Sequence, residues 1–165
     1  MSKAIIIYGS STGATEDIAK RIASKMGGAE VMNVTQFNES SAASLGDYDL
    51  IILGSSTWGI GDLQDDWHEK LDTLKGADLS GKKVAIFGTG DQFGYGDSFV
   101  DAIGILAEAA EAAGATIVGH TSTEGYEFEE SQAVRDGSFL GLAVDDTNQE
   151  EQTDPRIAAW VASLS

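Results

Sequence analysis

Three continuous apolar runs constrain the fold of this chain most strongly. They occupy residues 4–8, 50–53 and 84–87, and each is followed directly by a glycine. Short runs without polar alternation are typical of strands that are buried on both faces of a parallel sheet. Residues 31–34 and 116–118 indicate two further strands. The pattern therefore predicts a parallel sheet of five strands.

Helical spacing of apolar residues appears between these runs. Ile18, Ile22 and Met26 lie on one stripe, and Gly27 and Gly28 follow as a stop signal. Helices are expected over residues 15–26, 67–74, 99–114 and 154–164. The last would begin at Asp154-Pro155, where an N-cap residue precedes a proline at the first helical position. Alternating strands and helices predict a three-layer, doubly wound α/β fold, and a chain of 165 residues (1–165) suits a single domain.

One connection departs from this regular alternation. The segment from about residue 120 to residue 154 is far longer than the few residues that usually join a strand to a helix. Residues 139–144 within it have the composition of a resumed strand. We therefore expect an insertion, at about residues 120–140, that splits strand five.

Composition excludes several classes of function. With 10 basic and 27 acidic residues and both histidines neutral, the net charge is −17, which opposes binding to nucleic acids and to anionic membranes. The absence of cysteine excludes disulfides, iron–sulfur clusters and thiolate zinc sites. The apolar run at residues 4–8 is too short for a signal peptide or a membrane span. We expect a cytoplasmic protein.

Ligands of open α/β sheets bind beyond the carboxyl ends of the strands, where three loops of this chain have unusual compositions. The first loop offers hydroxyl groups and the free N–H groups of a helix start, which together suit a phosphate monoester. It comprises Ser10, Ser11, Thr12, Gly13, Ala14 and Thr15. It lacks the lysine of a Walker A loop and the GxGxxG pattern, so a nucleoside triphosphate with magnesium is not expected. A hydroxyl-rich helix cap is the alternative interpretation.

The other two loops each place an aromatic residue among glycines. The predicted site residues of the second loop are Ser56, Thr57, Trp58, Gly59, Ile60 and Gly61, and those of the third are Thr89, Gly90, Asp91, Gln92 and Tyr95. Two flat rings beside a phosphate loop form a slot for a planar ring with a phosphorylated tail. Taken alone, an aromatic residue of this kind is more often explained by ordinary packing, and the combination of three features favours the ligand slot.

These motifs resemble the flavodoxins, specifically their long-chain group, over essentially the whole chain. Residues 10–15 resemble the loop that binds the phosphate of FMN in that family. Trp58 resembles the tryptophan that covers the inner face of the isoalloxazine ring, and Tyr95 the tyrosine that stacks on its outer face. The stretch from 124–128 to 145–148 resembles the insertion of long-chain members. Ala14 departs from the family, many of whose members carry lysine there, so hydroxyl and backbone N–H groups alone would hold the phosphate.

The resemblance implies a sheet of strand order 2-1-3-4-5 and a low-potential one-electron carrier with non-covalently bound FMN. Such a protein has no catalytic residues and no metal, and it is expected to be a monomer. Its partners would be redox proteins, such as ferredoxin/flavodoxin-NADP reductase, nitrogenase-type enzymes, pyruvate oxidoreductase or photosystem I. The acidic excess agrees with a low potential, because each carboxylate about 10 Å from the reduced flavin opposes its negative charge by about 0.4 kcal/mol before salt screening.

Other interpretations have less support in the sequence. An FMN-dependent NAD(P)H:quinone reductase on the same fold would need a basic cluster for the extra phosphates, and none is evident. A signalling receiver domain would need acidic residues where Gly9 and Ser10 end strand one and Gly54 ends strand three. His68 is expected to be solvated, and His120 with Glu124 is only a weak metal pair. Two acidic clusters could dock basic partners: Asp62, Asp65, Asp66 and Glu69, and Glu124, Glu127, Glu129 and Glu130.

Overall fold

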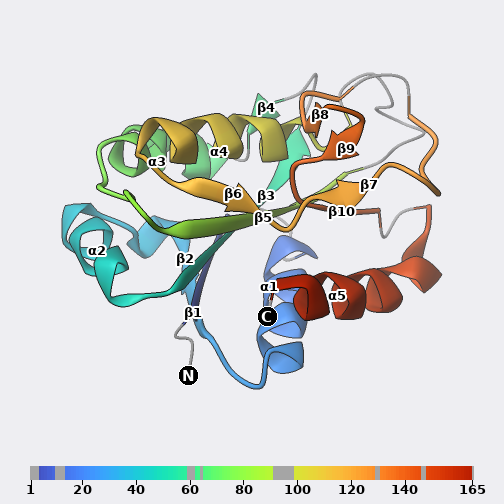
Figure 1. Cartoon of the computed structure of the whole chain (residues 1–165), viewed down its shortest axis with the longest axis horizontal. Coiled ribbons are helices and arrows are strands. Elements are labelled where there is room, and N and C mark those ends of the chain that lie inside the picture. The colour runs from blue at the N-terminus through green and yellow to red at the C-terminus, as the bar shows by residue number, and fades with distance from the viewer. Residues whose placement is uncertain are drawn as a thin grey trace.

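A central parallel sheet organises the chain (Figure 1). The structure is a computed structural model that describes residues 4–9, 14–58, 62–63, 65–90, 99–128, 131–145 and 148–164. The main strands are β1 (Ala4–Gly9), β2 (Glu30–Asn33), β3 (Leu50–Trp58) and β5 (Lys83–Thr89), with β6 (Thr116–Val118) and β10 (Leu142–Val144). The order runs β2-β1-β3-β5, with β6 and β10 both beside β5. The predicted order 2-1-3-4-5 is confirmed.

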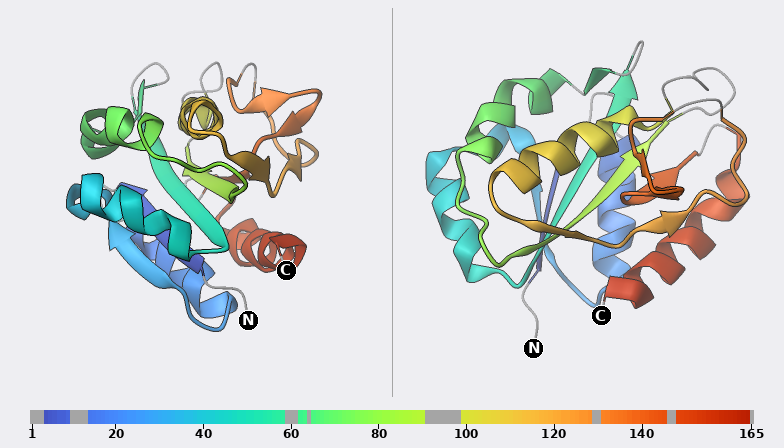
Figure 2. Two further views of the ribbon diagram at one scale, coloured as in Figure 1. Left: turned by 60° about the vertical axis from the view of Figure 1, so that its left-hand side comes forward. Right: turned by 45° about the horizontal axis from the view of Figure 1, so that its top comes forward.

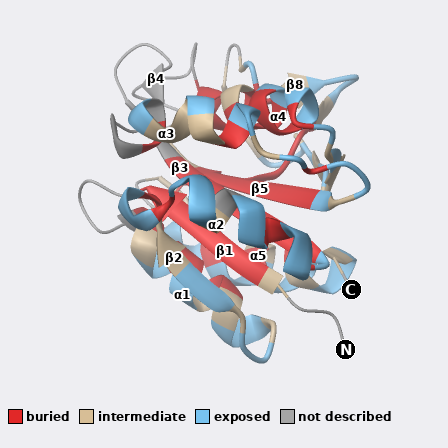
Figure 3. Cartoon of the chain, turned by 90° about the vertical axis from the view of Figure 1, so that its left-hand side faces the viewer, coloured by how far each residue is buried: buried red, intermediate tan, exposed pale blue. Residues whose placement is uncertain are grey.

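Alternating side chains of the central strands form two separate cores. In β1, Ile5 and Ile7 point into one cluster, whereas Ile6 and Tyr8 point into the other. All four are buried, which explains why the strand is apolar at every position rather than at every second one. Figure 3 shows β1 and β5 as largely buried ribbons in the middle of the molecule.

Two helices cover the first face of the sheet (Figure 2). They are α1 (Ala14–Lys25) and α5 (Glu150–Leu164), which pack on each other and bury Ile18, Ile22, Ile157 and Trp160 against the sheet. The prediction that the last helix begins at Asp154-Pro155 is wrong, because α5 begins at Glu150 and contains Pro155. Just before this start, the buried carboxylate of Asp145 accepts hydrogen bonds from the backbone N–H and the side-chain amide of Asn148 at 3.0 and 2.9 Å.

The helices α3 (Asp65–Lys75) and α4 (Asp101–Ala112) cover the opposite face. A short helix, α2 (Glu39–Ser44), and two 3-10 turns, η1 (Val34–Gln36) and η2 (Leu45–Asp47), join β2 to β3. The sequence analysis did not predict α2. Its local signal is Asn38, whose side-chain oxygen accepts the Ser41 N–H at 3.0 Å, as an N-cap residue does.

Strand five is split, as predicted. Its two halves, β6 and β10, pair with the beginning and the end of β5: Val84 is opposite Ile117, and Phe87 is opposite Leu142. The intervening segment forms a small antiparallel sheet of β7 (Thr121–Ser122), β8 (Val134–Arg135) and β9 (Ser138–Phe139). The resumed strand therefore begins at Leu142 and not at residue 139, because Phe139 pairs with Thr121 and Val134 in the insertion.

Aromatic side chains attach the insertion to the start of α4. Phe99, which precedes that helix, contacts Tyr126, Phe128 and Phe139 with ring centroids 5.6–6.0 Å apart. The guanidinium of Arg156 in α5 lies 3.9 Å from the centre of the Tyr126 ring. The insertion is thus packed against both helical layers. Within the described parts of the chain, no helix combines the length and hydrophobicity needed to cross a membrane.

Candidate functional site

Three strands end side by side at one edge of the sheet. Gly9, the last residue of β1, is opposite Ser55 of β3, and Ser55 is opposite Gly88 of β5. The chain leaves these strands toward the three loops that the sequence analysis selected. Gly9, Ser55 and Gly88, which are far apart in sequence, are therefore neighbours in space, which is the arrangement that one shared ligand beyond these strands requires.

The first loop lies between β1 and α1. Ser10, Ser11, Thr12 and Gly13 are outside the described residues, and Ala14 is the first residue of the helix. Thr15 is 1% exposed, and its hydroxyl oxygen lies 3.2 Å from that of Thr89 at the end of β5. A partly buried hydroxyl pair thus joins the start of α1 to the end of β5.

Cations near the start of α1 already have carboxylate partners. Lys20 pairs with Glu16 at 3.0 Å, and Arg21 pairs with Asp17 at 2.9 Å. The bond from Lys20 holds the pKa of Glu16 below its ordinary value, whereas burial and then the Glu16 carboxylate raise the pKa of Tyr8 at the end of β1. With alanine at position 14, an anion at this helix start would depend on neutral donors.

The second loop is shorter than predicted because β3 continues to Trp58. Thr57 is opposite Leu63 and Trp58 is opposite Asp62 in β4 (Asp62–Leu63), so the backbone of both residues belongs to an antiparallel strand pair. Ser56 lies in the same strand, opposite Thr89. Gly59, Ile60 and Gly61 lie outside the described residues.

The third loop is described only at its ends. Thr89 ends β5, and the N–H of Gly90 donates to the carbonyl oxygen of Val144 in β10 at 3.0 Å. Asp91, Gln92 and Tyr95 lie outside the described residues. Val100, just before α4, is a buried β-branched residue with left-handed φ and ψ of 47° and 33°. Such a conformation is strained for valine, so the surrounding packing must enforce it.

Two glycines at this edge are explained by packing inside the protein. A Cβ on Gly54 would overlap with the ring of Phe87, and a Cβ on Gly88 would lie 2.7 Å from Ile103. Glycines after strands commonly allow a sharp turn or the close approach of a ligand. The structure gives a third reason at these two positions, which is room for core side chains.

The sequence analysis missed the contribution of β10 to this edge. Val144 is opposite Thr89, and the buried Asp145 follows directly. The apolar run that ends at Val144 was the available signal, because a resumed fifth strand must end beside β5.

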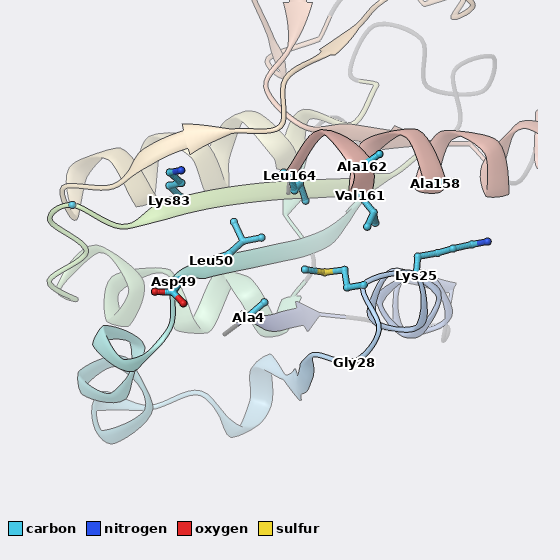
Figure 4. A pocket seen from close by; sticks show the side chains of 12 residues that line it. Ala4, Lys25, Gly28, Asp49, Leu50, Lys83, Ala158, Val161, Ala162 and Leu164 are labelled. Atoms are coloured by element: carbon cyan, nitrogen blue, oxygen red, sulfur yellow. The ribbon is translucent and has the colours of Figure 1, made fainter. Parts of the chain in front are cut away.

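A pocket of about 780 Å³ lies at the opposite edge of the sheet (Figure 4). Its lining includes Ala4, Leu50 and Lys83 at the amino ends of their strands, with Lys25 and Leu164 at the ends of α1 and α5. Among the predicted site residues that the structure describes, none lines it. It is therefore separate from the site proposed from the sequence.

The remaining candidates form no site in the described part of the chain. His120 and Glu124 are exposed, and the described residues contain no group of three or more potential metal ligands. Glu69 and Glu127 are exposed as expected of solvated acidic clusters. The side chains of His68, Asp62, Asp65 and Asp66, together with Glu129 and Glu130, are outside the description.

Known proteins match the chain over almost its full length. The family model for flavodoxins matches residues 6–160. A flavodoxin of Trichodesmium erythraeum is 46% identical over 168 residues, covering 99% of this chain and 96% of that protein. Flavodoxin 1 of Escherichia coli K12 is 44% identical over 161 residues, covering 97% and 91%.

A solved structure agrees with this assignment. The crystal structure of Fusobacterium nucleatum flavodoxin bound to flavin mononucleotide has a TM-score of 0.92 and 31% identity, and the alignment covers 99% of this chain and 97% of that one. The insertion that splits strand five is compatible with the long-chain group. On these matches and on the strand order, the chain belongs to the flavodoxin family.

Proposed function

We propose that this protein carries single electrons between redox enzymes by means of non-covalently bound FMN. The observation that supports the proposal is the register of β1, β3 and β5, in which the strands that precede the three predicted loops reach one edge of the sheet. The flavodoxin of Fusobacterium nucleatum, which shares the fold, was crystallised with flavin mononucleotide. When bound, FMN supplies the one-electron chemistry, and the protein supplies its binding, its orientation and its electrostatic surroundings.

The described residues fit a phosphate group at the start of α1. The helix begins directly after the first loop, so its first N–H groups have no partners within the helix and carry the positive end of its dipole. Thr15 brings a hydroxyl group to the same place. We propose that the phosphate is held by these groups with Ser10, Ser11, Thr12, Gly13 and the backbone of Ala14.

The second and third loops would hold the ring. We propose that Trp58 and Tyr95 cover its two faces, and that backbone and hydroxyl groups of both loops contact its edge and the ribityl chain. The remaining residues in this proposal are Ser56, Thr57, Gly59, Ile60, Gly61, Thr89, Gly90, Asp91 and Gln92. The packing at Gly54 and Gly88 supports this arrangement, because it holds β3 and β5 rigidly at the point where the loops leave them.

Charge favours an electron carrier over a pyridine-nucleotide reductase. A second pocket for NAD(P)H would need free cations near the ring, but Lys20 and Arg21 are paired with carboxylates. Lys25 and Lys83 lie at the far edge of the sheet. The net charge of −17 instead suits steered association with basic faces of redox partners. Reductases of the ferredoxin/flavodoxin-NADP type and low-potential acceptors are the partner classes we propose, for a cytoplasmic, monomeric, single-domain carrier.

Reconstitution tests the proposed function. Apoprotein mixed with FMN should acquire the absorbance bands of bound flavin and then pass electrons from a reductase to a one-electron acceptor protein. The same preparation should not consume NAD(P)H with a quinone when no reductase is present. Failure to bind FMN would contradict the proposal, and reductase-independent quinone reduction would favour the enzyme alternative.

A further inference from the structure

The hydroxyl groups of Thr15 and Thr89 form a hydrogen bond between the start of α1 and the end of β5. Their oxygen atoms are 3.2 Å apart although the residues are 74 positions apart in sequence. Thr15 lies in the first turn of α1 and Thr89 ends β5, and these elements follow different strands of the sheet. Thr15 is the second residue of α1, and the hydroxyl oxygen beside its own belongs to Thr89 of β5. Its partner therefore comes from another element.

We infer that Thr89 is a positioning residue for the phosphate of FMN, acting through Thr15. This inference rests on the proposed function, in which Thr15 is a phosphate ligand. A phosphate oxygen only accepts hydrogen bonds, and each threonine hydroxyl has a single hydrogen to donate. If Thr15 donates to the phosphate, its contact with Thr89 requires the Thr89 hydroxyl to be the donor. The Thr89 hydroxyl then donates to the Thr15 hydroxyl, and the Thr15 hydroxyl donates to the phosphate.

Thr89 is well placed for this role because its backbone is held on both sides. It is opposite Ser56 in β3 and opposite Val144 in β10, and the next residue, Gly90, bonds to Val144. The β-branched side chain has few rotamers, so a fixed backbone fixes the hydroxyl. A hydrogen bond donated by Thr89 then orients the Thr15 hydroxyl and strengthens the hydrogen bond that Thr15 donates to the phosphate. Thr89 at the end of β5 thereby orients the hydroxyl of Thr15, which follows a different strand.

The test compares two flavins that differ only in the phosphate. Wild-type apoprotein and the variants Thr89→Val and Thr89→Ser are titrated with FMN and with riboflavin, and the ratio of the two dissociation constants is measured. Loss of one hydrogen bond toward a charged site lowers affinity about fivefold. We therefore expect Thr89→Val to reduce the preference for FMN about fivefold and Thr89→Ser to restore it.

The outcomes separate the inference from the proposed function. If the wild-type protein binds both flavins equally, the phosphate site itself is wrong. If the wild type prefers FMN but Thr89→Val weakens both flavins by the same factor, Thr89 only supports the fold or the ring, and the inference is overturned. In a Thr15→Val background, Thr89→Val should no longer change the ratio, and an undiminished effect there would also overturn it. Should Thr89→Val not fold, Thr89→Ala is measured in the same way.

Discussion

The indole N–H of Trp67 donates a 2.7 Å hydrogen bond to the carbonyl oxygen of Gly54, and both groups are buried. This bond ties the first turn of α3 to β3 just before the strand leaves the core. A second tryptophan makes the same bond elsewhere: Trp160 in α5 donates to Gly119 at 2.7 Å, at the start of the insertion. The two bonds form a matched pair, of which only the first lies beside the proposed flavin site.

Replacing Trp67 with phenylalanine should weaken both the fold and the binding of FMN. The change removes a buried donor and some volume, and we expect the free energy of unfolding to fall by about 2–4 kcal/mol. Trp160→Phe is the control and should destabilise the protein without a specific loss of FMN affinity. Urea unfolding and flavin titration measure the two effects. Equal flavin affinities in the two variants would contradict a role for the Trp67 bond in shaping the second loop.

Replacing Gly54 with alanine should destabilise the protein strongly. The added methyl group would overlap with the ring of Phe87, which is itself fully buried. Overpacking of this kind costs about 1–3 kcal/mol. Gly46→Ala is the control, because a Cβ there meets nothing within 4 Å and the backbone is not left-handed. Urea midpoints of the two variants should differ clearly; coincident midpoints would show that Phe87 can move aside without cost.

Replacing Gly104 with alanine should loosen the insertion. Within a helix alanine is favoured over glycine by about 1 kcal/mol, but a Cβ on Gly104 would overlap with the backbone carbonyl of Gln132 in the insertion. The clash with backbone should exceed the gain in helix propensity. Amide hydrogen exchange checks this: the Leu140 N–H, bonded to Ala133 at 2.7 Å, should exchange faster, while the Ile52 amide in β3 is unchanged. A more stable variant with full protection at Leu140 would contradict the packing.

Tyr126 should make the protein sensitive to alkaline pH. Burial raises the pKa of Tyr126 to about 12 from an ordinary value of 10.0, and its hydroxyl donates to the Ala143 carbonyl at 2.6 Å. Between these two values the unfolded chain loses the proton while the folded chain keeps it. Stability contributed by this group is therefore complete below pH 10 and declines above it, by up to about 1.4 kcal/mol per pH unit.

Comparison with Tyr126→Phe isolates this effect. The variant should be less stable than the wild type at neutral pH, because it lacks the hydrogen bond to Ala143. It should also lose stability less steeply between pH 10 and 12. Chemical unfolding at several pH values gives both slopes. Parallel slopes would mean that the phenol titrates normally in the folded protein.

The buried strands could be predicted from the sequence because their burial is visible locally. A strand covered on both faces must be apolar at each position, and residues 4–8, 50–53 and 84–87 satisfy that rule without reference to any partner. The expectation that the segments after these strands lie near one another also followed from the sequence, since the carboxyl ends of parallel strands share one edge of the sheet. The split of strand five was also evident, because 139–144 resumed an apolar pattern after a polar segment.

Features that depend on distant partners could not be predicted in this way. The extension of β3 to Trp58 depends on its pairing with β4, and the earlier start of α5 follows a segment whose Asn148 is bonded to the buried Asp145. A proline preceded by aspartate is a good local start signal, but tertiary contacts override it at Pro155. The bond between Thr15 and Thr89 crosses 74 residues and leaves no local trace.

A reductive potentiometric titration of the FMN-loaded protein tests the central claim most directly. If the protein is a low-potential carrier, FMN takes up its two electrons in separate steps, and the second midpoint potential lies below that of free FMN. Because the acidic residues oppose the negative charge that full reduction places on the flavin, this potential should rise as added salt screens them. Uptake of both electrons in one step, at the potential of free FMN and without salt dependence, would contradict the account.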